Sequence, residues 1–304
     1  MTDKNPVCGV IGLGSMGSGV ARSLLRAGLA THVCDVRPEA VRQLAAEGAI
    51  ACASPARLGA AVDVAIVLVL NAEQTEAVLF GDQGAVSAMQ PGSAVLMSVT
   101  VPPDFAETLA ARLAERGILM IDGPVSGGAV KAAEGQLTVM ASGPPEAFAR
   151  AERVLAATAA TVYRLGDAPG TGSKVKMVNQ LLAGVHIAAL AEAMALGIRA
   201  GVDPRVLYEV ISNSAGSSWM FQNRVPRILA GDYTPLSAVN IFVKDLGIVL
   251  DSARRLTFPL PLAASAHQLF LATSAHGHGH EDDAAVIKVF QALTGIDLPA
   301  TMDA

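Results

Sequence analysis

The residues of this chain best suited to chemistry are a lysine and two amides on one face of a predicted helix. Lys176 closes the motif Gly170-Thr-Gly172-Ser-Lys-Val-Lys, and Asn179 and Gln180 follow three and four residues later. Residues at these spacings share one side of an α-helix. A lysine can remove the proton of an alcohol if burial or a nearby cation lowers its pKa from about 10.4. Lys176 is therefore the candidate general base, and the alternative is a solvated surface lysine.

A second glycine-marked segment could hold an acidic substrate. The run from Asp122 reads Asp-Gly-Pro-Val-Ser126-Gly127-Gly128 and follows an apolar stretch. A serine hydroxyl beside consecutive free backbone amides can bind a carboxylate. We expect Ser126, Gly127 and Gly128 to bind substrate, although Ser126 could also only shape a turn.

The opening of the chain predicts a dinucleotide site. Apolar residues from Val7 lead into Gly12-Leu13-Gly14-Ser15-Met16-Gly17, a helical run follows, and a second strand ends at Asp35. The glycines allow a tight turn and a close approach to a pyrophosphate, and the acid can accept hydrogen bonds from ribose hydroxyls. The alternative is a glycine turn in another kind of α/β protein. We expect the cofactor to contact Gly12, Leu13, Gly14, Ser15, Met16, Gly17, Asp35, Val36 and Arg37.

Asp35 favours NAD as the cofactor, because a carboxylate at that position repels the 2′-phosphate of NADP. Arg37 argues the other way, since its guanidinium could hold that phosphate. Arg37-Pro38-Glu39 is also a plausible start for the next helix.

The elements that position these residues form two halves. Short β-rich runs at 7–11, 31–34, 64–70, 94–98, 118–121, 137–141 and 161–165 alternate with helical stretches, as in a doubly wound sheet. Helices are expected at 173–199, 204–213, 218–230, 238–256, 262–275 and 283–293. The sequence thus predicts a Rossmann-type nucleotide domain over 1–168, an all-α domain over 169–304 that opens with a long interdomain helix, and a cleft between the two.

Composition excludes several classes of protein. The chain has 304 residues, 52% of them hydrophobic, and a net charge of −5 without a dense Lys/Arg run, which disfavours nucleic-acid binding. Cys8, Cys34 and Cys52 form no disulfide framework, and residues 1–6 contain no hydrophobic targeting core, so a cytoplasmic protein is expected.

Two segments invite other interpretations. The stretch 180–198 is apolar for nearly the length of a membrane span, but His186 and Glu192 interrupt it, and buried packing between domains or subunits is favoured. This packing suggests a homodimer or homotetramer. His276-Gly-His278-Gly-His280 could chelate a metal, but a glycine-rich mobile loop before capping aspartates is favoured, and no metal is expected.

The motifs at 12–17, 124–128 and 170–176, together with Lys244-Asp245-Leu246, resemble the β-hydroxyacid dehydrogenase family, which includes 3-hydroxyisobutyrate dehydrogenase. The resemblance spans nearly the whole chain and implies a C-terminal domain like that of 6-phosphogluconate dehydrogenase. It also implies roles for single residues. Thr100 would contact the nicotinamide ribose or the substrate, and Leu70 and Asn71 would lie in a turn that contacts the cofactor. Lys244 would lie beside the nicotinamide. Asn179, Gln180 and Asp245 would contact the substrate, and Asp245 would also help close the site.

Two positions depart from the family pattern. Gln180 stands where a second asparagine is usual, so its hydrogen bond to substrate could be longer or absent, and Val99-Thr100 replaces Ser-Thr. Lys244 and Asp245 could instead be an exposed ion pair. Trp219, the single tryptophan, could be core or could line the substrate pocket.

The expected function is oxidation of the C2 hydroxyl of a small sugar acid, because the segments 181–189, 218–221, 231–235 and 241–246 most resemble family members that act on four-carbon sugar acids with NAD. One alternative reverses the direction and reduces tartronate semialdehyde, glyoxylate or succinic semialdehyde, more often with NADPH. Others are a 3-hydroxyisobutyrate dehydrogenase and, disfavoured by the intact site, a nucleotide-binding regulator without turnover.

Overall fold

The computed structural model describes residues 5–299 and divides into two compact units, Met1–Lys176 and Met177–Ala304. The division falls inside the first turns of the long helix that was expected to open the second domain. Residues 1–4, which belong to the segment expected to lack a targeting core, lie outside the described residues.

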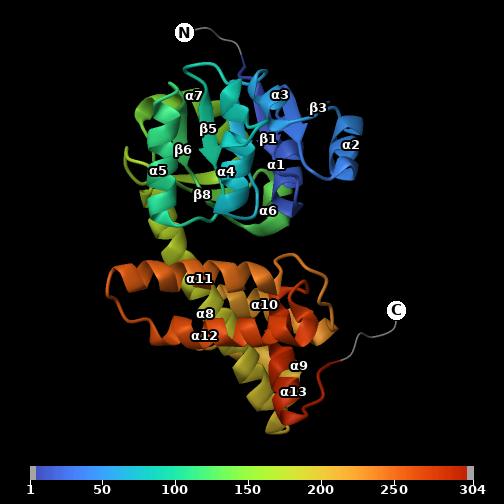
Figure 1. Cartoon of the computed structure of the whole chain (residues 1–304). Helices are drawn as coiled ribbons and strands as arrows, with labels where there is room; N and C mark the ends of the chain where they lie inside the picture. Colours follow the sequence, from blue (N-terminus) through green and yellow to red (C-terminus); the bar gives the residue numbers. More distant parts are fainter. Residues whose placement is uncertain (1–4, 300–304) are drawn as a thin grey trace. The chain divides into compact units, whose positions relative to one another are not determined.

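The first unit contains a six-stranded parallel sheet (Figure 1), whose strand order is β3-β2-β1-β4-β5-β6. This is the order of a doubly wound dinucleotide-binding sheet and confirms the predicted Rossmann-type fold. The strands are β1 (Cys8–Ile11), β2 (Thr31–Cys34), β3 (Ile50–Ala51), β4 (Val64–Val67), β5 (Ala94–Met97) and β6 (Leu119–Asp122). The two residues of β3 are exposed, and their sequence did not predict a strand.

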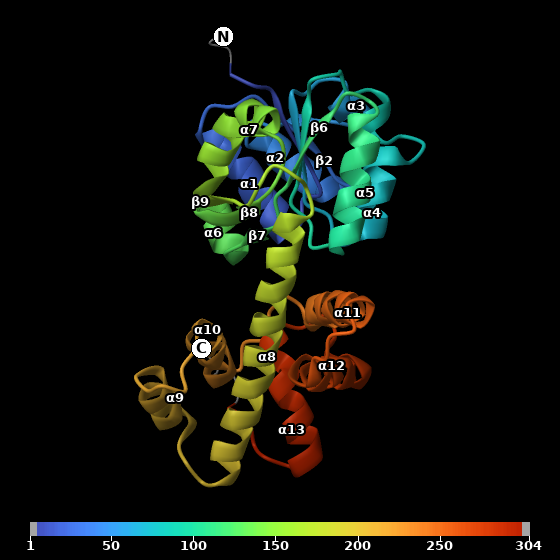
Figure 2. The same cartoon turned by 90° about the vertical axis from the view of Figure 1, so that its left-hand side faces the viewer.

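Helices cover both faces of this sheet (Figure 2) because its central strands are apolar on both sides. Val10 and Ile66 point to one face, and their neighbours Ile11 and Val67 point to the other. One face packs against α1 (Ser15–Arg26), α2 (Pro38–Ala46) and α7 (Pro145–Thr158), and α6 (Gly128–Glu134) packs against α1. The other packs against α3 (Pro55–Gly59), α4 (Ala72–Phe80), the 3-10 helix η1 (Ala85–Ser87) and α5 (Pro103–Ala114).

The remaining strands form a second sheet, which corrects the expectation of one continuous sheet. Its order is β7-β8-β9, with β7 (Val125–Ser126) antiparallel and β9 (Ala159–Arg164) parallel to β8 (Leu137–Ala141). The chain leaves β6 through Gly123-Pro124 and then turns at Gly127 and Gly128, whose φ angles are 137° and 76°. The departure from the six-stranded ladder at Gly123-Pro124 comes before β7, and the turn at Gly127 and Gly128 comes after it. Among the described residues an isolated bridge between Asp122 and Ser142 joins the two sheets.

The second unit is helical in the described residues, as predicted. It contains most of α8 (Thr171–Arg199), α9 (Pro204–Ser212), α10 (Trp219–Ala230), α11 (Val239–Arg255), α12 (Pro261–Thr273), η2 (Ser274–His278), η3 (Asp283–Val286) and α13 (Ile287–Thr294). Its core joins Ile187 of α8 to Val225, Phe242 and Phe270 from α10, α11 and α12. Phe242 and Phe270 stack with ring centroids 5.1 Å apart.

By length and composition α8 could cross a membrane, but one side of it packs in a protein core. Ile187, Ala191 and Met194 are completely buried in the core of the second unit. His186 and Glu192, the two residues that interrupt its apolar run, are exposed. Leu182 and Leu196 of α8 are exposed as well, and the packing of its other side in a helical core is typical of a globular domain.

The histidine tract follows α12 as a kinked turn. Within Ser274–His278 (η2) the backbone leaves helical geometry at Gly277, whose φ is 92°, so a glycine of the tract interrupts the helix. The ring of His278 lies 2.9 Å from the carboxylate of Glu281. Asp282 does cap the next element, as expected, because its side chain accepts a hydrogen bond from the Ala284 amide. The described residues contain no group of three or more potential metal ligands.

The loop between β1 and α1 and the first turn of α1 contain three glycines with different structural roles. A side chain at Gly17 would place its Cβ 1.8 Å from the carbonyl oxygen of Gly12, so only glycine lets α1 pack here. Gly12 has a φ of 93°, and its Cβ would lie 2.6 Å from the Leu68 carbonyl oxygen. Gly14 has no atom within 4 Å of its ideal Cβ and a φ of −63°. The protein itself therefore does not require glycine at position 14, which leaves room for a bound group.

This difference gives a testable prediction. Gly17→Ala should lower the free energy of unfolding by about 2 kcal/mol or more through overpacking, whereas Gly14→Ala should change it by less than about 1 kcal/mol. Gly14→Ala should nevertheless weaken dinucleotide binding at least about tenfold, the equivalent of about 1.4 kcal/mol, because the methyl group occupies the approach to the pyrophosphate. Urea denaturation and calorimetric titration measure the two quantities. A Gly14→Ala variant with unchanged affinity would place the dinucleotide elsewhere.

Candidate active site

The carboxyl ends of five parallel strands lie in one row. The pairing register aligns Cys34, Ile11, Val67, Met97 and Asp122, each the last residue of its strand. The segments that follow these residues therefore leave the sheet along the same edge. They contain the expected cofactor and substrate residues of the first unit, and ligands of open α/β sheets bind at this edge.

Asp35 is already bonded to the glycine loop. Its Oδ2 accepts a hydrogen bond from the Leu13 amide at 2.5 Å, and its Oδ1 accepts one from the Arg37 amide at 2.8 Å. Burial alone would raise the pKa of Asp35, but hydrogen bonds from Arg37 and Leu13 hold it below its usual value. The carboxylate is therefore charged near neutral pH and fixed in position before any ligand binds.

Arg37 reaches back across the same loop. Its Nη2 donates to the carbonyl oxygen of Leu13 at 2.8 Å, and its Nε lies 3.2 Å from Asp35 Oδ1. Arg37 also stands at the N-cap position of α2, before Pro38, as its sequence context suggested. Two of its guanidinium nitrogens are therefore engaged within the protein.

Two of the residues expected to contact the cofactor are exposed apolar side chains. Val36 is 95% exposed and Leu70 is 47% exposed, at the ends of β2 and β4. Exposed apolar side chains at this edge of the sheet are suited to contact the flat rings of a dinucleotide, which stays a prediction. Asn71 has a structural role in addition to its expected one, because its side chain caps α4 by accepting from the Gln74 amide at 2.8 Å. Thr100 is half-buried in the segment after β5.

Lys176 is buried beside the segment expected to bind substrate. Its side chain is on α8, the residue is 7% exposed, and Nζ donates to the carbonyl oxygen of Val125 at 2.8 Å. Val125 directly precedes Ser126, and Gly127 is the N-cap of α6. The interpretation of Lys176 as a solvated surface lysine is wrong, and its amine lies against the backbone of the predicted carboxylate site.

A buried carboxylate that the sequence analysis assigned no role lies between these segments. Asp122, at the end of β6, is fully buried and accepts from the Gly170 amide at 2.9 Å. It also accepts from the amide and hydroxyl of Ser173 at 2.8 and 2.7 Å. Burial raises the pKa of Asp122, although these hydrogen bonds act in the opposite direction. The sequence signal that could have pointed to Asp122 is its position as the first residue of the 122–128 motif. Its hydrogen-bond partners, however, are about 50 residues away in sequence.

The second unit holds a connected set of polar side chains. Asp245 is 2% exposed in α11, and its carboxylate accepts from Gln180 Nε2 at 2.6 Å and pairs with Lys244 Nζ at 2.5 Å. The carbonyl oxygen of Gln180 in turn accepts from Asn179 Nδ2 at 3.0 Å. The alternative of an exposed Lys244–Asp245 pair is wrong. Both ends of the Gln180 amide are engaged within the protein, and its contact with substrate stays a prediction.

Trp219 is not a core residue. It is 58% exposed and is the first residue of α10, whose N-cap is Ser218. The Ser218 hydroxyl accepts from the Phe221 amide at 3.0 Å, so this serine caps the helix. The role of Trp219 in substrate binding stays a prediction.

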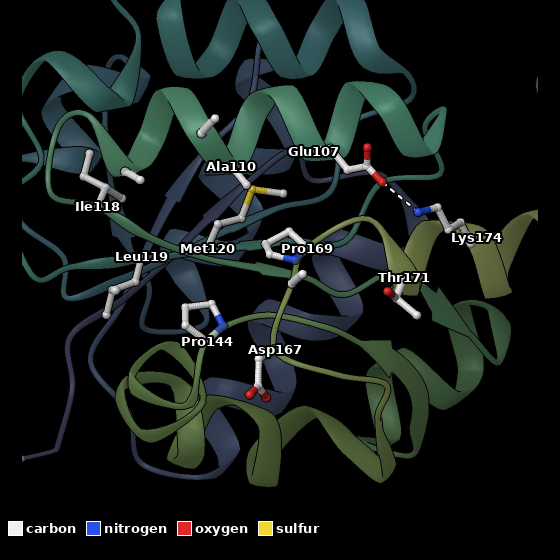
Figure 3. Close-up of a pocket in the computed structure, with 13 residues that line it drawn as sticks. Glu107, Ala110, Ile118, Leu119, Met120, Pro144, Asp167, Pro169, Thr171 and Lys174 are labelled. Carbon is white, nitrogen blue, oxygen red and sulfur yellow. Dashed lines mark hydrogen bonds and ion pairs between the residues drawn. The ribbon is translucent and has the colours of Figure 1, made fainter.

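A separate cavity of about 550 Å³ lies in the first unit between α5, β6 and the start of α8 (Figure 3). An ion pair of 2.7 Å between Glu107 and Lys174 stands on one side, and Met120 and Pro169 are among its apolar lining. None of the residues expected to bind cofactor or substrate lines it. This cavity is therefore separate from the residues expected to bind the cofactor and the substrate.

Comparison with known proteins assigns both halves of the chain. Residues 7–166 match the family model described as the NAD binding domain of 6-phosphogluconate dehydrogenase. Residues 170–290 match the model described as the NAD-binding domain of NADP-dependent 3-hydroxyisobutyrate dehydrogenase. Together the two models cover the glycine loop, the Ser126 segment, Lys176 and the Lys244–Asp245 pair.

Full-length relatives agree with these models. The chain is 66% identical over 291 residues to an L-threonate dehydrogenase of Cupriavidus necator, covering 96% of this chain and 97% of that protein. It is 52% identical to the L-threonate dehydrogenase of Escherichia coli K12, covering 94% and 95%. A crystal structure described as 3-hydroxyisobutyrate dehydrogenase from Salmonella typhimurium has a TM-score of 0.88 at 54% identity, covering 93% of this chain and 99% of that one. The chain therefore belongs to the β-hydroxyacid dehydrogenase family, the family of 3-hydroxyisobutyrate dehydrogenase.

Proposed function

We propose that this protein oxidises the C2 hydroxyl of L-threonate to the 2-oxo acid, with NAD as hydride acceptor. The observation that carries the proposal is the buried amine of Lys176, 2.8 Å from the backbone of the Ser126 segment. Relatives at 50–66% identity over nearly the full chain are named L-threonate dehydrogenases, which supports this choice of substrate.

In the proposed mechanism one set of residues binds the substrate carboxylate and another residue accepts the hydroxyl proton. The substrate carboxylate is bound by the Ser126 hydroxyl and the amides of Gly127 and Gly128. Lys176 removes the proton of the C2 hydroxyl as the hydride leaves C2, so the alcohol becomes a ketone and the amine becomes an ammonium. Bound NAD supplies the nicotinamide C4 that accepts the hydride.

Residues further along α8 and α11 orient the remainder of the substrate. Asn179 is one turn beyond Lys176 and holds its amide toward Gln180. Asp245 fixes Gln180 and Lys244 at once, and a side chain fixed by two buried hydrogen bonds loses little further freedom when substrate binds. We assign Asn179, Gln180, Asp245 and Trp219 to substrate and Lys244 to the nicotinamide side.

NAD rather than NADP is proposed because of Asp35 and Arg37. The carboxylate is held at the end of β2 by the Leu13 amide and would repel a 2′-phosphate. Arg37, the residue that could offset that repulsion, directs two nitrogens to Leu13 and Asp35 instead. The family model for the second half is named for an NADP-dependent enzyme, so cofactor choice needs a direct measurement.

The exposed apolar surface of the second unit supports a homo-oligomer. Leu196 of α8 is 68% exposed, and Val206 and Val210 of α9 are 50% and 58% exposed. α9 has no buried residue although its apolar and polar residues lie on separate sides. A second copy of the chain is the proposed cover, in a symmetric dimer or tetramer. With free thiols at Cys8, Cys34 and Cys52, we also propose the reducing cytoplasm as its location.

The role of Lys176 is tested by substitution. Lys176→Ala should lower kcat with L-threonate about 10²- to 10⁴-fold, the usual contribution of a general base, while NAD affinity stays within about twofold. The matched control is Lys174→Ala, an exposed lysine two residues away that pairs with Glu107. Steady-state kinetics and NAD titration provide both measurements. A Lys176→Ala enzyme with near-normal kcat would refute the mechanism.

Substrate and cofactor are tested together. L-threonate, glycerate and 3-hydroxyisobutyrate assayed with NAD and with NADP should give the highest kcat/KM for L-threonate with NAD. Asp35→Asn keeps an acceptor for the Leu13 amide but removes the charge, so the kcat/KM ratio of NADP to NAD should rise about tenfold. Glu39→Gln, an exposed carboxylate in the first turn of α2, is the control and should leave the ratio unchanged. Preference of the wild-type enzyme for NADP would contradict the role given to Asp35.

The oligomer is tested by charge on the exposed surface. Leu196→Glu combined with Val210→Glu should reduce the mass of the particle measured by light scattering during gel filtration, since burying unpaired carboxylates in an interface is unfavourable. Tyr163→Glu, a change at a 56% exposed residue of the first unit, should leave the mass unchanged. A wild-type protein that is monomeric at micromolar concentration would exclude this proposal.

A further inference from the structure

The start of α8 is attached to the end of β6 through one side chain. Asp122 is fully buried and accepts three hydrogen bonds, from the Gly170 amide and from both the amide and the hydroxyl of Ser173. The first amides of a helix have no intrahelical acceptor and carry partial positive charge. A carboxylate, which only accepts hydrogen bonds, is suited to satisfy several such donors at once.

The backbone of α8 is pressed against the strand ends at the same place. The Gly172 amide donates to the Ser142 hydroxyl at 3.0 Å, at the end of β8. A Cβ on Gly172 would lie 2.4 Å from the Met140 carbonyl oxygen and 2.5 Å from that of Asp122. The start of α8 therefore contacts both sheets of the first unit directly, through its backbone and through buried polar groups.

The second attachment of this helix is the candidate base itself. Lys176 follows Ser173 by three residues, and its amine donates to the carbonyl oxygen of Val125. Val125 follows Asp122 by three residues. The segment 122–126 thus holds α8 twice, once at Ser173 through the carboxylate and once at Lys176 through the backbone. A shift of the helix start would move the amine along the segment that carries Ser126.

We propose that Asp122 is a positioning residue for the reaction: it holds the first turn of α8 so that the amine of Lys176 meets a substrate bound at Ser126. The inference rests on the proposed function in one respect, the role of Lys176 as base. Asp122 does not touch the reacting atoms and acts through the helix. A lysine side chain has four rotatable bonds, so its precision depends on a fixed backbone and on its carbonyl acceptor.

The position of the amine can be measured without any substrate. Acetic anhydride labels lysine amines according to their exposure and protonation, and peptide mass spectrometry separates Lys176 from the exposed Lys174. In Asp122→Ala the labelling rate of Lys176 relative to Lys174 should rise about tenfold or more, since a helix start with three unpaired donors moves toward solvent. Ser173→Ala removes one donor and keeps the backbone contacts, so its relative rate should rise less.

Activity gives the second readout. Asp122→Ala and Asp122→Asn should lower kcat about 10- to 100-fold, the scale of an error of about 1 Å in a reacting group, with NAD affinity changed less than about twofold. Ser173→Ala should lower kcat least. The matched control is Asp63→Ala, which removes another carboxylate that accepts a backbone amide, that of Val7, and pairs with Arg150. It should change thermal stability alone.

The outcomes separate the two proposals. If Asp122→Ala does not fold, Asp122→Asn and Ser173→Ala provide the same comparison in milder form. Folded Asp122 variants with wild-type labelling of Lys176 and wild-type kcat would overturn the positioning role. Altered labelling in the Asp122 variants, together with a wild-type enzyme that oxidises none of the hydroxy acids, would retain the positioning role and reject the proposed function. If Asp63→Ala changes the labelling of Lys176 and kcat as much as Asp122→Ala does, Asp122 only stabilises the fold and does not position Lys176.

Discussion

Parallel pairing imposes one constraint on which the first unit depends: strands that run in the same direction direct their carboxyl ends to one edge of the sheet. The last residues of β2, β1, β4, β5 and β6 are aligned in one row, so the segments that follow them all begin at the same edge of the sheet. Backbone groups that leave a ladder need new partners. At this edge the glycine loop bonds to Asp35, and the start of α8 bonds to Asp122. The same geometry that frees these groups also places them along one edge of the sheet.

Carboxylates satisfy this requirement at both ends of the row. Asp35 binds the Leu13 amide beside the first strand, and Asp122 binds the Gly170 and Ser173 amides beside the last. Asp245 has a comparable place in the second unit, between Gln180 and Lys244. Each acid is largely buried and bonded to several donors, which is the condition under which a buried charge is tolerated. Groups held in this way are rigid before ligands arrive, which limits the entropy lost on binding.

Local signals were sufficient for much of this architecture. The apolar run 64–70 predicted β4, the Gly12–Gly17 motif predicted the loop, and the long apolar stretch without strand signals after Gly172 predicted α8. Asn179 and Gln180 could be placed beside Lys176 because a helix fixes their spacing. The separate sheet of β7, β8 and β9 could not be foreseen, since pairing of Ser126 with Thr138 is a matter of tertiary geometry. The partners of Asp122 were missed for the same reason: no local pattern encodes them.

The single tryptophan of the chain, Trp219, is 58% exposed at the start of α10 in the second unit. Intrinsic emission excited at long ultraviolet wavelengths therefore originates from one unit only, and from an indole in contact with water. Melting of the nucleotide-binding sheet alone would leave that emission unaltered, while circular dichroism would register it. The pair of spectroscopies thus resolves whether the two halves lose their structure in one cooperative step or in succession.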